Sequence, residues 1–106
     1  LATHYAVHAA TAQKILALAG RSEPQARDLF DLSLLLSRPD AVGLRLTGEQ
    51  KRALPDAIEH ASGISFDQYK SGVIAYLDPT QAALYQERTE FEALRQLVVS
   101  RLRALR

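Results

Sequence analysis

Apolar residues recur every three or four positions along most of this chain, which is the spacing of amphipathic helices. Sustained alternation of apolar and polar residues is missing, and no Asn-Gly or Asp-Gly pair marks a hairpin. The pattern therefore predicts an all-α fold, a bundle of five or six helices with short loops. The predicted helices cover approximately residues 6–19, 25–36, 47–63, 65–77, 80–87 and 89–105.

Capping residues and breakers set these predicted boundaries. Three pairs have the spacing of a capping box, in which a hydroxyl and an amide or acid side chain bond each other's backbone: Thr47 with Gln50, Ser65 with Gln68, and Thr89 with Glu92. Gly20 and Gly63 are predicted stops, and Thr80 is the predicted cap of the short fifth helix. Pro55 removes a backbone donor inside the third helix, so we expect a kink or a break there.

Two of the helices carry clear apolar stripes that predict buried faces. They comprise Phe66, Tyr69, Val73, Tyr76 and Leu77 in the fourth helix, and Phe91, Leu94, Val98, Leu102 and Leu105 in the last.

The length of 106 residues and the 47% hydrophobic content suit one helical domain, residues 1–106. Cysteine is absent, which excludes disulfides and thiolate metal sites and fits a cytoplasmic location. Methionine is absent too, and Leu1 is a poor product of N-terminal trimming, so we expect a C-terminal fragment of a larger protein. The net charge of +1 provides no strong field for nucleic acid, and no apolar run is long enough for a membrane span.

The densest group of charged residues lies in the first two helices. Lys14 interrupts an apolar run, Arg21 follows it, and Arg27-Asp28 precedes Asp31 in a second, very apolar helix. If the two helices pair antiparallel, Lys14 can approach both carboxylates, and such a cluster could bind phosphate. The same residues also fit a structural interpretation. Asp28 complements the helix dipole, and Arg27 with Asp31 is an ordinary i,i+4 pair.

These residues resemble a known family. The stretch Gln13-Lys14-Ile15-Leu16-Ala17-Leu18, then Arg21, then Gln25-Ala26-Arg27-Asp28-Leu29-Phe30-Asp31-Leu32 is similar to the second half of the AbiEii/AbiGii-type nucleotidyltransferase toxin family. The resemblance is specific over about residues 10 to 36 and general beyond, where Val73-Ile74-Ala75-Tyr76-Leu77 and Phe91 precede a basic last helix.

The resemblance implies a nucleotidyltransferase-like toxin of a toxin–antitoxin or abortive-infection system. An N-terminal α/β half would hold Mg²⁺ and a nucleoside triphosphate through a Gly-Ser motif and paired Asp residues. Carried over, Lys14 would contact phosphate and Asp28 would be the catalytic carboxylate, with Asp31 as second candidate. Arg21 and Arg27 would support substrate binding. The implied partners are the missing N-terminal domain, a cognate antitoxin protein and tRNA as the acceptor.

This chain departs from the family pattern because it contains neither the Gly-Ser motif nor an Asp-x-Asp pair. No metal is therefore expected within this chain, and we expect it to be inactive alone. The alternative is a non-catalytic helical module that binds a protein or RNA. An apolar face left uncovered would also let the isolated chain form a homodimer.

Other candidates have weaker support. His4 and His8 have helical i,i+4 spacing but no third metal ligand, and His60 suits a helix C-terminus as a structural residue. The tyrosines, Tyr5, Tyr69, Tyr76 and Tyr85, are expected to pack rather than to stack on bases. The basic tail, Arg95, Arg101, Arg103 and Arg106, fits either a solvated helix face or contact with a phosphate backbone.

Overall fold

A computed structural model describes residues 2–41 and 43–106, with the side chains of residues 2–5 and 40 outside the description. Within this part the chain forms six α-helices, two short 3₁₀ helices and no strand, which confirms the predicted all-α bundle. The α-helices are α1 (Ala2–Gly20), α2 (Ala26–Leu36), α3 (Gly48–Gly63), α4 (Phe66–Gly72), α5 (Pro79–Tyr85) and α6 (Arg88–Ala104), and the 3₁₀ helices are η1 (Pro39–Ala41) and η2 (Ile74–Tyr76).

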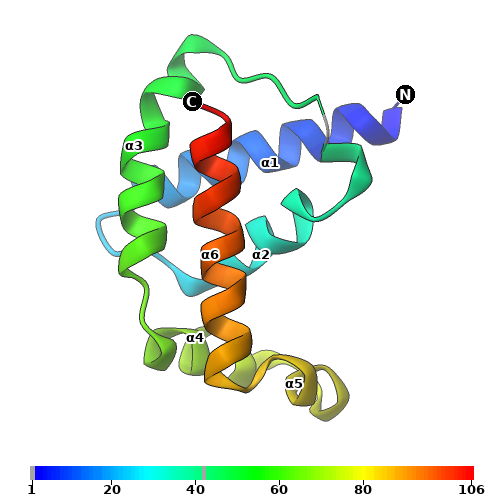
Figure 1. Cartoon of the computed structure of the whole chain (residues 1–106), viewed down its shortest axis with the longest axis vertical. Coiled ribbons are helices and arrows are strands. Elements are labelled where there is room, and N and C mark those ends of the chain that lie inside the picture. Colours follow the sequence, from blue (N-terminus) through cyan, green and yellow to red (C-terminus); the bar gives the residue numbers. More distant parts are fainter. Residues whose placement is uncertain (1, 42) are drawn as a thin grey trace.

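The helices stack in two layers. In Figure 1, α3 and α6 stand side by side in front, and α1 and α2 cross behind them. The Cα extent along the viewing direction is 19 Å, which accommodates two helices packed at about 10 Å between axes. The short helices α4 and α5 close one end of the bundle.

The core lies between these layers and draws on every long helix. Its largest fully buried side chains are Tyr69, Phe91, Ile15, Leu18, Leu29, Leu32, Leu54, Ile64 and Leu102. The stripe predicted for α6 is confirmed for Phe91, Leu94, Val98 and Leu102, which are buried, while Leu105 is partly buried against the core. Burial of these side chains, each contributing about 1.5–3 kcal/mol, is the main stabilising term of the fold.

Two predicted capping boxes are present. Thr47 Oγ1 accepts a hydrogen bond from the Gln50 amide at 3.2 Å, and the Gln50 side chain accepts from the Thr47 amide at 2.9 Å. Ser65 and Gln68 repeat the arrangement at 3.1 and 2.8 Å. Both α3 and α4 therefore start where the sequence predicts.

Of the kink or break predicted at Pro55, the break is wrong, because α3 is continuous from Gly48 to Gly63. Pro55 and Lys51 are both exposed. The Lys51 carbonyl, which would have received the missing proline hydrogen bond, can be hydrated instead. Proline is tolerated here because it faces solvent.

The predicted helix over residues 65–77 is shorter than expected. α4 ends at Gly72, and Val73 leaves the helical conformation with φ −125° and ψ −63° before η2 begins. This turn keeps Val73 in the core, while Tyr76 is 76% exposed. The prediction that Tyr76 packs in a stripe is therefore wrong.

The last two helices begin differently from the prediction. Asp78, rather than Thr80, caps α5: its Oδ1 accepts from the Gln81 amide at 2.8 Å, with Pro79 in the first turn. The predicted Thr89–Glu92 box is also wrong, because α6 already begins at Arg88 with Glu87 as an N-cap that forms no side-chain capping bond.

Tyr69 combines complete burial with an unpaired hydroxyl. Its ring is 4.9 Å from that of Phe91 and 6.4 Å from that of Phe30, and its hydroxyl has no hydrogen-bond partner among the described residues. Burial, helped by the nearby Tyr85 and Glu90, raises the pKa of Tyr69 to about 12. Because the folded protein favours the neutral phenol, this group does not lower the free energy of unfolding below the ordinary tyrosine pKa near 10. The free energy of unfolding falls as the pH rises from there through about 12.

We predict that Tyr69→Phe stabilises the protein by about 1 kcal/mol, because it removes a buried polar group without a partner and keeps the ring contacts. The measurement is urea unfolding at neutral pH. Absorbance titration at alkaline pH checks the same point, since the ionisation near pH 12 should disappear in the variant. A loss of stability on removing the hydroxyl would contradict this account of Tyr69.

Candidate functional site

The first two helices form an antiparallel pair that positions the charged residues singled out in the sequence. α1 ends at Gly20, and only residues 21–25 separate it from α2 at Ala26. Because this link is short, the last turns of α1 lie against the first turns of α2. Lys14 therefore faces Asp28 and Asp31, as the antiparallel arrangement predicts.

Five charged side chains form a continuous row, here called the α1–α2 charge cluster. Lys14 Nζ lies 3.3 Å from Asp28 Oδ1 and 3.0 Å from Asp31 Oδ2. Arg21 Nε donates to Asp28 Oδ2 at 2.7 Å, and Arg27 Nε donates to Asp31 Oδ1 at 3.3 Å. Acidic and basic groups thus alternate from Arg21 to Arg27, with Lys14 at the centre.

The two carboxylates differ sharply in exposure. The Asp28 side chain is only 2% exposed, and each of its oxygens accepts a bond from a cation. The Asp31 side chain is 23% exposed and Lys14 is 34% exposed. Asp28 is therefore the buried anchor of the cluster, whereas Asp31 and Lys14 form its accessible part.

Lys14 is held in its charged form. The hydrogen bond to Asp31 raises the pKa of Lys14, partial burial opposes this, and Asp28 raises the pKa further. The contribution of Lys14 to stability is therefore complete below the ordinary lysine pKa and is lost only as the pH rises above the raised value. At physiological pH this group is a fixed cation and does not act as a general base.

The donor set suits a phosphate better than a metal ion. A lysine ammonium has three protons, and two of them are directed at Asp28 and Asp31, which leaves one for an external anion. Both carboxylates are already neutralised by cations, so they do not fit a Mg²⁺ site. No group of three or more His, Asp or Glu side chains that could hold a metal occurs among the described residues.

His60 takes a structural role that links two helices. His60 Nδ1 is 2.7 Å from the Leu18 carbonyl oxygen and connects α3 to α1, a tertiary contact that its helix-end position in the sequence did not reveal. The side chains of His4 and Tyr5 fall outside the described residues, so the interpretations for them remain predictions.

The basic tail divides into a structural residue and solvent-facing ones. Arg95 donates to the carbonyl of Ile64, the C-cap of α3, at 2.9 Å and lies 5.0 Å from the centre of the Phe91 ring. Arg101, Arg103 and Arg106 are exposed. Among the tyrosines, Tyr85 packs edge-on against Phe30 at 5.2 Å, as a packing role predicts.

Comparisons of the chain with protein-family models, curated protein sequences and solved structures give no match. The described helices include none that is long and apolar enough to cross a membrane.

The difference in burial between the two aspartates leads to a stability prediction. Asp28→Asn should lower the free energy of unfolding by about 2–3 kcal/mol, because it leaves Lys14 and Arg21 facing an uncharged group in a buried position. The matched variant Asp31→Asn should cost less than about 1 kcal/mol, since its pairs are solvent-accessible. Urea unfolding of the three proteins decides the matter, and equal losses would contradict the anchoring role of Asp28.

Proposed function

We propose that this chain is the helical part of a nucleotidyltransferase-like toxin, in which the α1–α2 charge cluster meets the phosphates of a nucleoside triphosphate held by a separate domain. The observation that carries the proposal is the Lys14 ammonium, which two aspartates hold in place while about a third of the side chain remains exposed. The likeness of residues 10 to 36 to the AbiEii/AbiGii-type family supports the choice of reaction.

In this proposal Lys14 contributes charge rather than proton transfer. Pre-positioned cations stabilise the negative charge that develops on a transferring phosphoryl group, and they do so without reorganising during the reaction. Arg21 and Arg27 each use only the Nε donor within the cluster, so their terminal nitrogens are available for further phosphate oxygens.

The two aspartates take different roles. Asp31 is the carboxylate that an acceptor hydroxyl can reach, so it orients the acceptor or accepts its proton. Asp28 acts indirectly, because its buried carboxylate holds Lys14 and Arg21 in position. The family resemblance favours Asp28 as the catalytic carboxylate and Asp31 as the second candidate. We reverse this order because Asp28 is buried and Asp31 is accessible.

The divalent ion that the resemblance implies has no place in this cluster. When bound in the separate domain, Mg²⁺ would neutralise phosphate charge. The α1–α2 charge cluster supplies cations, which complement that role and do not duplicate it.

The test is nucleotide transfer by the full-length protein that contains this chain, with magnesium, each labelled nucleoside triphosphate in turn, and total tRNA. Lys14→Ala should reduce transfer by at least about 100-fold, because it removes a preorganised cation from the reacting phosphates. Asp31→Asn should reduce transfer comparably while leaving the protein folded, as judged by circular dichroism.

The matched control is Lys51→Ala, which removes an exposed lysine from α3 and should leave transfer unchanged. Wild-type rates in the Lys14→Ala protein would eliminate the proposal. Equal losses in the Lys51→Ala protein would also contradict it, since the effect would then be one of overall charge.

A further inference from the structure

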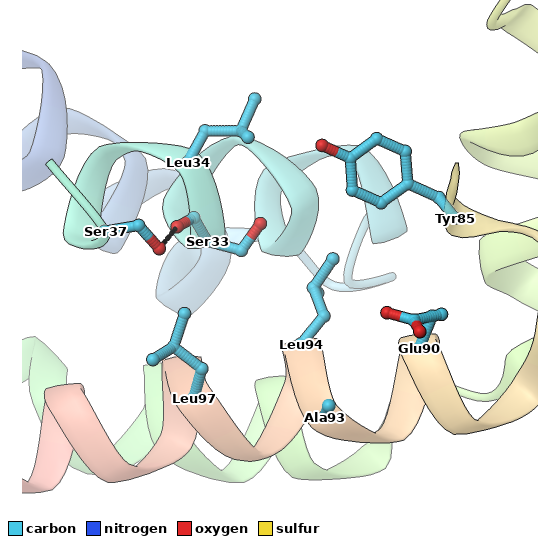
Figure 2. Close-up of a pocket in the computed structure, with 8 residues that line it drawn as sticks. All are labelled: Ser33, Leu34, Ser37, Tyr85, Glu90, Ala93, Leu94 and Leu97. Atoms are coloured by element: carbon cyan, nitrogen blue, oxygen red, sulfur yellow. Dashed lines mark hydrogen bonds between the residues drawn. The ribbon is translucent and has the colours of Figure 1, made fainter. Parts of the chain in front are cut away.

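A groove between α2 and α6 lies outside the charge cluster. Its volume is about 480 Å³, and its walls include Leu34 from α2, Leu94 and Leu97 from α6, and Tyr85 at the end of α5. Figure 2 shows the α6 side chains pointing toward α2 across this groove, with Tyr85 and Glu90 at one end. Leu34 is 46% exposed although it is large and apolar.

The groove offers little to a polar ligand. The Ser33 hydroxyl donates to the Phe30 carbonyl at 2.6 Å, and the Ser37 hydroxyl donates to the Ser33 carbonyl at 2.6 Å (Figure 2). Both serine protons are therefore used within α2 and its C-cap residue, Ser37. Apart from Tyr85 and Glu90 at one end, the other lining residues, Leu34, Ala93, Leu94 and Leu97, are apolar and suit contact with a protein surface.

Charges flank the apolar part of α6 in a symmetric order. Glu90, Leu94, Leu97 and Arg101 follow one another at spacings of four, three and four, so they lie on one face of the helix. The midpoint between Glu90 and Arg101 coincides with the midpoint between Leu94 and Leu97, halfway between residues 95 and 96. Glu90 and Arg101 are exposed and form no ion pair within the described residues.

We propose that this groove is the contact face of a homodimer in which α6 pairs antiparallel with α6 of a second copy. A two-fold axis through the shared midpoint places the partly exposed Leu97 of one copy against the edge of Leu94 of the other, of which 9% is exposed. The same operation places Glu90 of each copy opposite Arg101 of the other, which gives two equivalent ion pairs. The apolar contact and both ion pairs thus arise from one symmetry operation.

Charge complementarity favours this occupant and this direction. A parallel pairing would bring Glu90 against Glu90 and Arg101 against Arg101, which is repulsive at both ends. The antiparallel pairing satisfies all four charges, and it covers the exposed rim at Leu34. The dimer makes no use of the α1–α2 charge cluster, so it stands independently of the nucleotidyltransferase proposal.

The experiment is a charge exchange across the interface, read by sedimentation equilibrium of the 106-residue chain from about 10 µM to 1 mM. The wild type should form dimers. Arg101→Glu and Glu90→Arg should each raise the dimer dissociation constant at least about tenfold, because each single reversal creates two like-charge contacts. The double variant should restore dissociation to within about threefold of wild type.

Arg103→Glu is the matched control. It makes the same charge change two residues away, on a different side of α6, and should leave the dimer intact. A wild type that remains monomeric throughout, a double variant as weak as the single ones, or a control as damaging as Arg101→Glu would each overturn the proposal. Circular dichroism of these surface variants verifies that every protein compared is folded.

Discussion

The ion pairs of the Asp28 carboxylate with Lys14 and Arg21 hold α1 and α2 together and also position the candidate site. The carboxylate is almost completely buried, and it accepts bonds from Lys14 on one oxygen and from Arg21 on the other. A carboxylate is stable in such a position only when cations and hydrogen bonds replace its hydration. The ion pairs of Asp28 therefore require Lys14 of α1 and Arg21, which follows α1, to lie beside the first turn of α2. The same alignment of the two helices leaves Lys14 and Asp31 partly exposed to solvent.

The packing around this pair explains why the cluster lies at a surface and not inside the core. Ile15 and Leu18 of α1 and Leu29 and Leu32 of α2 are completely buried, which directs the neighbouring polar positions outward. α3 and α6 form the other layer of the bundle (Figure 1). Arg95 supports that layer by satisfying the last carbonyl at the end of α3. The charge cluster and the α2–α6 groove thus belong to separate surfaces that share α2.

The sequence predicts the fold class and the proximity of the charged residues, because periodicity and short loops are local properties. Thr47 and Ser65 show this well: each capping box depends on residues three apart. Predictions failed where tertiary contacts decide the outcome. The core contact of Val73 ended α4 early, and solvent exposure made Pro55 tolerable. The different exposure of Asp28 and Asp31, 2% against 23%, is not visible in their spacing and comes from the structure.

A double-mutant cycle on Lys14 and Asp28 tests the central claim most directly. The free energies of unfolding of wild type, Lys14→Met, Asp28→Asn and the combined variant yield the coupling between the two side chains. If the buried carboxylate holds the lysine in place, the coupling should be about 1 kcal/mol or more, and stabilising. Effects that add to within about 0.3 kcal/mol would show that the two groups act separately, and would contradict the account.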